Sequence, residues 1–152
     1  MIYLDSSVLI AFLYEESTRP DRFTVVARLV ELIRSGRVRA MISFYALPEL
    51  YGYLSEQYKT TPFNTTFRLS LIELFSIPCE VAPHLSRTGT EKWRHRISMS
   101  DSTDVPHVAS ALANHCQAIV TFDDHFHQVA NLIPIYTPAE YLATLENVSK
   151  RP

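Results

Sequence analysis

The chain begins with Met1-Ile2-Tyr3-Leu4-Asp5-Ser6-Ser7-Val8-Leu9-Ile10, in which an apolar run ends at an aspartate and two serines. Short apolar runs with β-branched and aromatic residues are typical of buried strands. Mainly apolar residues continue to Tyr14, and serine is a favoured helix N-cap, so we expect Ser6 or Ser7 to cap a helix. The opening therefore predicts a strand over 2–5 and then a helix, with the aspartate at their junction.

Outward from this opening, the chain repeats the alternation of strand and helix. We predict further strands at 38–42, 79–82, 117–122 and 132–136, and helices at 22–35, 43–57, 62–76, 103–115 and 138–147. Ser43 is the expected N-cap of its helix, and Pro48 should bend that helix or shift its start. Residues 84–100 give no clear pattern. Strands that alternate with helices form a parallel sheet covered on both faces, so an α/β fold is predicted.

Length and composition narrow the possible classes of protein. A chain of 152 residues fits one domain, which we place at 1–147 with a short tail at 148–152. Its three glycines form no phosphate-binding loop. No apolar run has the length of a membrane span, and no basic segment precedes the first strand. With only two cysteines, Cys79 and Cys116, we expect free thiols and a cytoplasmic protein.

Four acidic residues lie where this fold would bring them to one edge of the sheet. Asp5 and Asp123 follow predicted strands, and Glu49 and Asp104 lie near the starts of predicted helices. Ligands of open α/β sheets bind beyond the carboxyl ends of the strands. Carboxylates gathered there repel one another unless they share a divalent cation. Each acid alone has a simpler explanation as a helix cap, a solvated helical acid or a turn residue.

Two more residues near Asp104 have open roles. Asp101 is a candidate fifth ligand, an acid that orients a ligand, or a cap. His107 is a candidate base, but the apolar residues beside it favour a partly buried structural histidine. His125 and His127 have no cysteine partners at zinc spacing, so oxygen ligands and a hard cation fit better.

One basic cluster precedes Asp101. It contains Arg87, Lys92, Arg94 and Arg96 around Trp93. An ordinary solvated surface and an RNA-binding edge explain this cluster equally well. The net charge of −2 excludes neither, because local charge matters more than the sum.

Four segments together resemble a known family. They are Leu4-Asp5-Ser6-Ser7-Val8-Leu9-Ile10, Ser43-Phe44-Tyr45-Ala46-Leu47-Pro48-Glu49-Leu50, Asp104-Val105-Pro106-His107-Val108-Ala109-Ser110-Ala111-Leu112 and Val120-Thr121-Phe122-Asp123-Asp124-His125-Phe126. In order and spacing, over nearly the whole chain, they are similar to the four acidic motifs of PIN-domain ribonucleases. Ser7 stands where that family usually has asparagine, and Pro48 directly precedes the second acid.

The resemblance implies a three-layer α/β/α sandwich with a central parallel sheet of four to five strands. It also implies a metal-dependent endoribonuclease in which Asp5, Glu49, Asp104 and Asp123 bind Mg²⁺ or Mn²⁺ and activate a water. Ser6 and Thr121 would then orient waters or carboxylates. Many small PIN proteins are VapC-type toxins, which implies an RNA substrate, a protein antitoxin and a homodimer.

Two alternatives are weighed against the nuclease. One is a degenerate PIN domain that binds RNA or a protein without cleaving. The other is a phosphatase with an aspartate nucleophile, which usually needs Asp-x-Asp after its first strand. Asp5-Ser6-Ser7 lacks that second aspartate.

Overall fold

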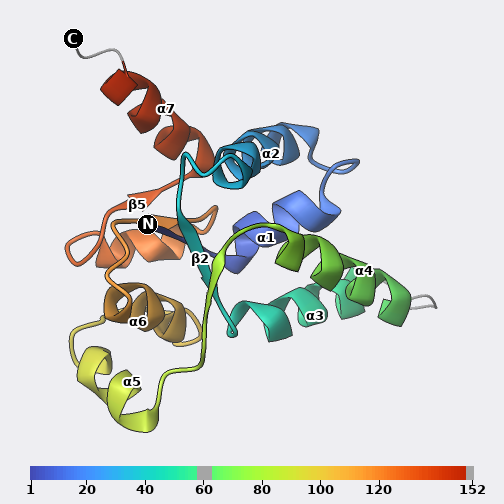
Figure 1. Ribbon diagram of the computed structural model, residues 1–152. Coiled ribbons are helices and arrows are strands. Elements are labelled where there is room, and N and C mark those ends of the chain that lie inside the picture. The colour runs from blue at the N-terminus through green and yellow to red at the C-terminus, as the bar shows by residue number, and fades with distance from the viewer. Residues whose placement is uncertain (58–62, 150–152) are drawn as a thin grey trace.

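A computed structural model describes residues 1–57 and 63–149 of the chain (Figure 1). Its centre is one five-stranded sheet in the order β3-β2-β1-β4-β5, and every neighbouring pair is parallel. The strands are β1 (Ile2–Leu4), β2 (Ala40–Ser43), β3 (Glu80–Ala82), β4 (Ile119–Val120) and β5 (Ile135–Tyr136). Because the first strand lies in the middle, its carboxyl end meets those of β2 and β4, which come much later in the sequence.

Helices connect the strands. They are α1 (Ser6–Tyr14), α2 (Pro20–Arg34), α3 (Ala46–Gln57), α4 (Phe63–Ser76), α5 (Arg87–Arg94), α6 (Val105–Ala113), the 3₁₀ helix η1 (Asp124–Val129) and α7 (Pro138–Ser149). None of the helices within the described residues is long and apolar enough to cross a membrane. Residues 150–152 of the predicted tail lie outside the described residues.

The alternation of side chains along β1 separates two hydrophobic cores. Ile2 and Leu4 pack on one face with residues of α1, α2, α3, α4 and α7. Tyr3 points to the other face, where it packs with residues of α6 and η1. In Figure 1 these two groups of helices lie on opposite sides of the strands. The predicted three-layer α/β/α sandwich with a parallel sheet is confirmed.

Two predicted helix caps were wrong. Asp5, not a serine, is the N-cap of α1, and its side chain accepts a hydrogen bond from the Ser7 backbone N–H. Ser43 is the last residue of β2, and its side chain is fully buried against Tyr3. The following helix starts only at Ala46, so Pro48 lies in its first turn, where a missing N–H costs little.

Other differences concern lengths and two helices that were not predicted, α5 and η1. Residues 84–100 contain α5, whose N-cap Ser86 accepts a hydrogen bond from the Gly89 N–H. The predicted strand over 117–122 is reduced to Ile119–Val120, although the Thr121 N–H still donates to the Tyr136 carbonyl of β5. Cys79 and Cys116 are free thiols, as expected.

Candidate active site

Asp5 is held in place at the end of β1. Its side chain is buried, and its Oδ2 accepts hydrogen bonds from the Ser7 N–H at 3.2 Å, the Ser7 hydroxyl at 2.6 Å and the Thr121 hydroxyl at 2.9 Å. The Ser7 hydroxyl in turn accepts from the Phe122 N–H at 3.0 Å. Ser7 therefore ties the start of α1 to the end of β4 and fixes the orientation of the carboxylate. The sequence signalled Ser7 only as a departure from the asparagine of the resembled family.

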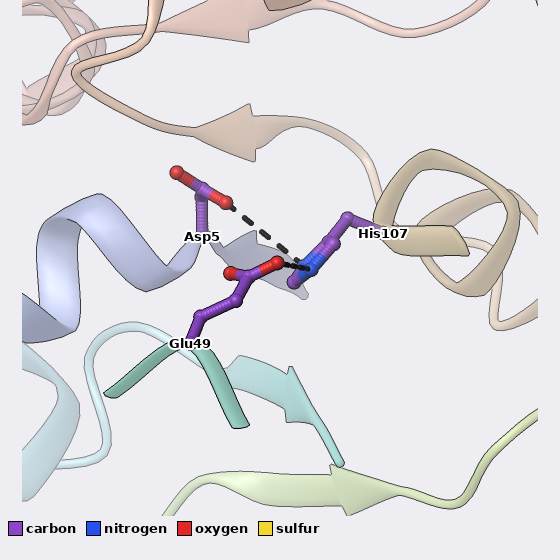
Figure 2. Close-up of side chains that lie close together, drawn as sticks. All are labelled: Asp5, Glu49 and His107. Carbon is purple, nitrogen blue, oxygen red and sulfur yellow. Dashed lines mark hydrogen bonds and ion pairs between the residues drawn. The ribbon is translucent and has the colours of Figure 1, made fainter. Parts of the chain in front are cut away.

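His107 links Asp5 to Glu49 (Figure 2). Its ring is buried to 1% exposure, with Nε2 at 3.0 Å from Glu49 Oε1 and Nδ1 at 3.9 Å from Asp5 Oδ1. In Figure 2 both carboxylates turn an oxygen toward this ring. His107 had been expected to be a partly buried structural residue. It is instead fully buried and hydrogen-bonded to one of the predicted site acids.

A chain of buried hydrogen bonds supports His107 from the sheet. The Tyr3 hydroxyl lies 2.8 Å from His107 Nδ1 and 2.6 Å from the Ser43 hydroxyl. With its proton on Nε2, His107 donates to Glu49, while Nδ1 accepts from Tyr3. The order Ser43, Tyr3, His107, Glu49 forms a relay that fixes the Glu49 side chain, although Glu49 itself is partly exposed.

Glu49 and His107 each shift the pKa of the other toward the charged form. Burial opposes ionisation of Glu49, but the His107 hydrogen bond and charge, with a hydrogen bond from Ser6, outweigh it and lower the Glu49 pKa. Burial likewise lowers the pKa of His107, yet the contact with Glu49 and the charges of Asp5 and Asp104 outweigh burial and raise it. The pair therefore favours an ionised carboxylate beside an imidazole that protonates readily.

Asp104 is in the opposite situation. It is the N-cap of α6, and its Oδ2 is buried with no hydrogen-bond partner in the part of the chain that the structure describes. Burial raises its pKa to about 6, with further contributions from the negative charges of Asp123, Asp101 and Asp5. An orphaned carboxylate oxygen among three other acids is the arrangement that a divalent cation would stabilise.

Asp101, Asp123 and His125 surround Asp104. Asp123 caps η1 and accepts from the His125 N–H at 2.8 Å. Asp101 accepts from the Thr103 N–H and hydroxyl, and these bonds lower its pKa. Asp101, Asp104 and His125 each offer a ligand atom, all within 4.8 Å of one another, as do Asp5, Glu49 and His107. Asp123 is in neither of these two groups, although its negative charge and that of Asp5 both raise the Asp104 pKa.

The predicted auxiliary residues fall in two places. Thr121 contacts Asp5, and Ser6 contacts Glu49. Arg87, Lys92 and Arg94 lie on α5, with Arg96 just after it, and α5 packs against α6. Arg87 pairs with Glu91, while Lys92 and Arg96 lie over the Trp93 ring. RNA binding by this cluster remains a prediction.

Comparison with known proteins places this geometry in a family. A sequence model of the PIN domain matches residues 1–125. The chain belongs to the PIN-domain family. A comparison with curated protein sequences gave no match.

Solved PIN-domain structures show the same fold. VapBC2 from Rickettsia felis, bound to a DNA fragment from its promoter, matches with a TM-score of 0.67 and 18% identity, over 90% of this chain and 98% of that chain. VapC20 of Mycobacterium tuberculosis, a sarcin-ricin loop cleaving toxin, matches with 0.64 and 16%, over 90% and 99%. VapBC-1 from Haemophilus influenzae matches with 0.60 and 18%, over 91% and 99%. At these identities the likeness concerns the PIN fold.

Proposed function

We propose that this PIN-domain protein is a metal-dependent endoribonuclease and the toxin of a type II toxin–antitoxin pair. The observation that carries the nuclease proposal is the orphaned Asp104 carboxylate, whose pKa is raised by burial and by neighbouring acids. A protein that only binds RNA gains nothing from concentrated negative charge at this edge, because that charge repels the RNA phosphates. The set of carboxylate oxygens suits a hard cation such as Mg²⁺ or Mn²⁺.

Asp5, Glu49, Asp104 and Asp123 are the residues we propose to hold the cation, with Asp101 as a further candidate. The cation would supply a water of lowered pKa and neutralise charge on the scissile phosphate. Other side chains of the protein hold two of these ligands in position before a cation binds. Ser7 and Thr121 fix Asp5 by three hydrogen bonds, and His107 fixes Glu49. Few ligands on this side need to reorganise when the cation binds.

The test is cleavage of structured RNAs, such as tRNA and rRNA fragments, by purified protein with Mn²⁺, with Mg²⁺ and with chelator. Metal-dependent cutting that is lost in Asp5→Asn supports the proposal. The absence of cutting by a folded wild-type protein under every condition would favour the alternative, a degenerate PIN domain that binds RNA or protein. Metal titration by calorimetry separates the two, because a degenerate domain needs no cation.

The toxin role is supported by the solved structures whose fold this chain shares. Two of the similar structures are VapBC assemblies, and one is a toxin that cleaves the sarcin-ricin loop. We propose that this chain likewise has a protein antitoxin, cuts RNA and forms a homodimer in the cytoplasm. A size-exclusion run with light scattering would check the dimer, and co-purification with the product of an adjacent small gene would check the antitoxin.

An exposed apolar strip on α4 suits the antitoxin. Leu69, Ile72 and Phe75 are 60%, 69% and 51% exposed. Exposed apolar side chains gathered in one place are typical of an interaction site. Leu69 and Ile72 also line a cavity of about 600 Å³ together with Phe12 and Phe23. The double change Leu69→Glu and Ile72→Glu should therefore prevent antitoxin binding while leaving RNA cleavage intact.

A further inference from the structure

A second cavity lies beside the acidic site, on the far side of Ser7. Its volume is about 440 Å³, and its walls include Ser7, Glu15, Arg19, Arg22 and Tyr53. Ser7 belongs to both places, because its hydroxyl also donates to Asp5 Oδ2. The cavity is therefore adjacent to the proposed cleavage centre but is lined by a different kind of charge.

Two arginines share one carboxylate in this cavity. Glu15, the C-cap of α1, has a side chain only 6% exposed. Arg22 Nη1 lies 3.4 Å from Glu15 Oε2, and Arg19 Nη1 lies 3.9 Å from Glu15 Oε1. Two guanidinium groups against one carboxylate leave a formal charge of about +1 in the cavity. This positive charge lies next to a site whose own ligands are almost all negative.

Arg22 is held in one orientation. Its Cζ atom lies 3.9 Å from the centroid of the Phe122 ring, at cation–π distance. Its Nε is buried with no hydrogen-bond partner within residues 1–57 and 63–149. Phe122 directly precedes Asp123, and its N–H donates to Ser7. The guanidinium is thus stacked on the residue that directly precedes Asp123, and the contacts with Glu15 use only its Nη1.

We propose that this cavity binds the phosphate of an RNA nucleotide next to the one that is cleaved, with Arg22 as the main contact and Arg19 as the second. The inference rests on the ribonuclease proposal and names a subsite for it. An acidic site repels RNA, so a substrate needs attraction from close by. Arginine suits phosphate because its planar fork donates two parallel hydrogen bonds. A purely structural Glu15–Arg22 pair would not explain the second arginine beside the same carboxylate.

The experiment measures binding of a fluorescein-labelled single-stranded RNA of mixed sequence by anisotropy, in full-length protein carrying Asp5→Asn to prevent cleavage. Added Arg22→Gln should weaken binding about tenfold and lower the salt dependence by about 0.7 in slope. Arg19→Gln should weaken it about threefold, because this side chain is 60% exposed. The matched control is Arg28→Gln on the same helix α2, an exposed arginine paired with Glu146, which should leave binding unchanged.

Glu15→Gln gives a change of opposite sign. Removing the carboxylate frees both arginines, so RNA binding should tighten although a buried ion pair is lost. Thermal melting checks that every variant is folded. If Arg22→Gln does not fold, Arg19→Gln alone tests the subsite. Equal dissociation constants for the parent and both arginine variants would overturn the RNA subsite. This holds even if the cavity binds an acidic peptide instead. If the parent binds no RNA and the wild type cuts none, the ribonuclease proposal itself fails, and the subsite with it.

Discussion

The two halves of the acidic site differ in how their carboxylates are satisfied. In the buried half, Asp5 accepts three hydrogen bonds and Glu49 contacts His107. In the other half, the buried Oδ2 of Asp104 has no partner among the described residues, and the Asp104 pKa is raised to about 6. The first half is built by the fold itself. The second half carries unrelieved repulsion, which the proposed cation would remove.

The two halves of the site therefore contribute to the stability of the fold with opposite signs. In the buried half, hydrogen bonds from Ser7, Thr121 and His107 stabilise the folded state. Repulsion among Asp104, Asp101 and Asp123 makes the other half a cost that the rest of the fold has to offset. Loss of a hydrogen-bond partner in the buried half and loss of the Asp104 charge in the other half should therefore change stability in opposite directions, while substitution of a proposed ligand in either half should reduce activity.

The largest expected effect is on cleavage by Asp5→Asn. We expect the rate to fall by about a thousandfold or more, because a proposed ligand loses its charge. The fold should survive, since an asparagine oxygen can accept the same three hydrogen bonds. Gel assays of RNA cleavage with Mn²⁺ and circular dichroism give the two readouts. Near-normal cleavage by a folded variant would remove Asp5 from the site.

Tyr3→Phe tests the buried half without touching a carboxylate. Loss of the hydroxyl leaves His107 Nδ1 and the Ser43 hydroxyl without their shared partner, so the free energy of unfolding should fall by about 1–3 kcal/mol. Urea denaturation measures this change. Tyr51→Phe, at a half-exposed tyrosine, is the control and should change little. If the two variants are equally stable, the relay does not support the site.

Asp104→Asn tests the other half, and its expected sign is reversed. In metal-free protein the melting temperature should rise by about 2–4 °C, because a partly buried negative charge beside other acids disappears and the Asp104 side chain makes no cap hydrogen bond that could be lost. The rise in melting temperature on adding Mn²⁺ should vanish. Asp124→Asn, at an exposed neighbouring acid, is the control. A lower metal-free melting temperature would show that repulsion at Asp104 is unimportant.

The smallest effect is a pH dependence of the metal response. The folded pKa of Asp104 is raised from 3.8 to about 6, so its contribution to metal-free stability is full below about pH 4 and is lost as the pH rises through 6. The cation needs the ionised form, so its stabilisation should grow over the same range. Melting curves with and without Mn²⁺ at about pH 5 and about pH 7.5 should differ by a few degrees more at the higher pH. The same shift at both values would contradict the role of Asp104.

Much of the fold was predictable because its signals are local. Apolar runs of strand type and helical spacing of apolar residues predicted all five strands of the sheet and most helices. Helix α5 was missed because its sequence, Arg87–Arg94, is almost entirely polar and buries no residue completely. Ser43 was misassigned as a cap because serine is favoured there, whereas its burial against Tyr3 depends on the neighbouring strand.

The sequence predicted where the four acids lie in the fold, but not which residues hold them there, and their role as ligands stays a prediction. The positions of Asp5, Glu49, Asp104 and Asp123 follow from strand ends and helix starts. The part played by Ser7 and the burial of His107 depend on contacts between residues far apart in sequence, such as the 104 residues that separate Tyr3 from His107. No local sequence pattern predicts such contacts, so they are visible only in the three-dimensional structure.

The central position of β1 has a consequence for how the protein is made. Thr121, which holds Asp5, is 116 residues further along the chain. At about 5–20 residues per second, a ribosome takes on the order of ten seconds to travel between them. Until β4 is made, the first strand lacks at least one of its two neighbours, and Thr121 and Asp123 are absent. On the ribonuclease proposal, a nascent chain that stops before β4 would not cleave the RNA of the ribosome that is making it, because it lacks Asp123 and the Thr121 contact to Asp5.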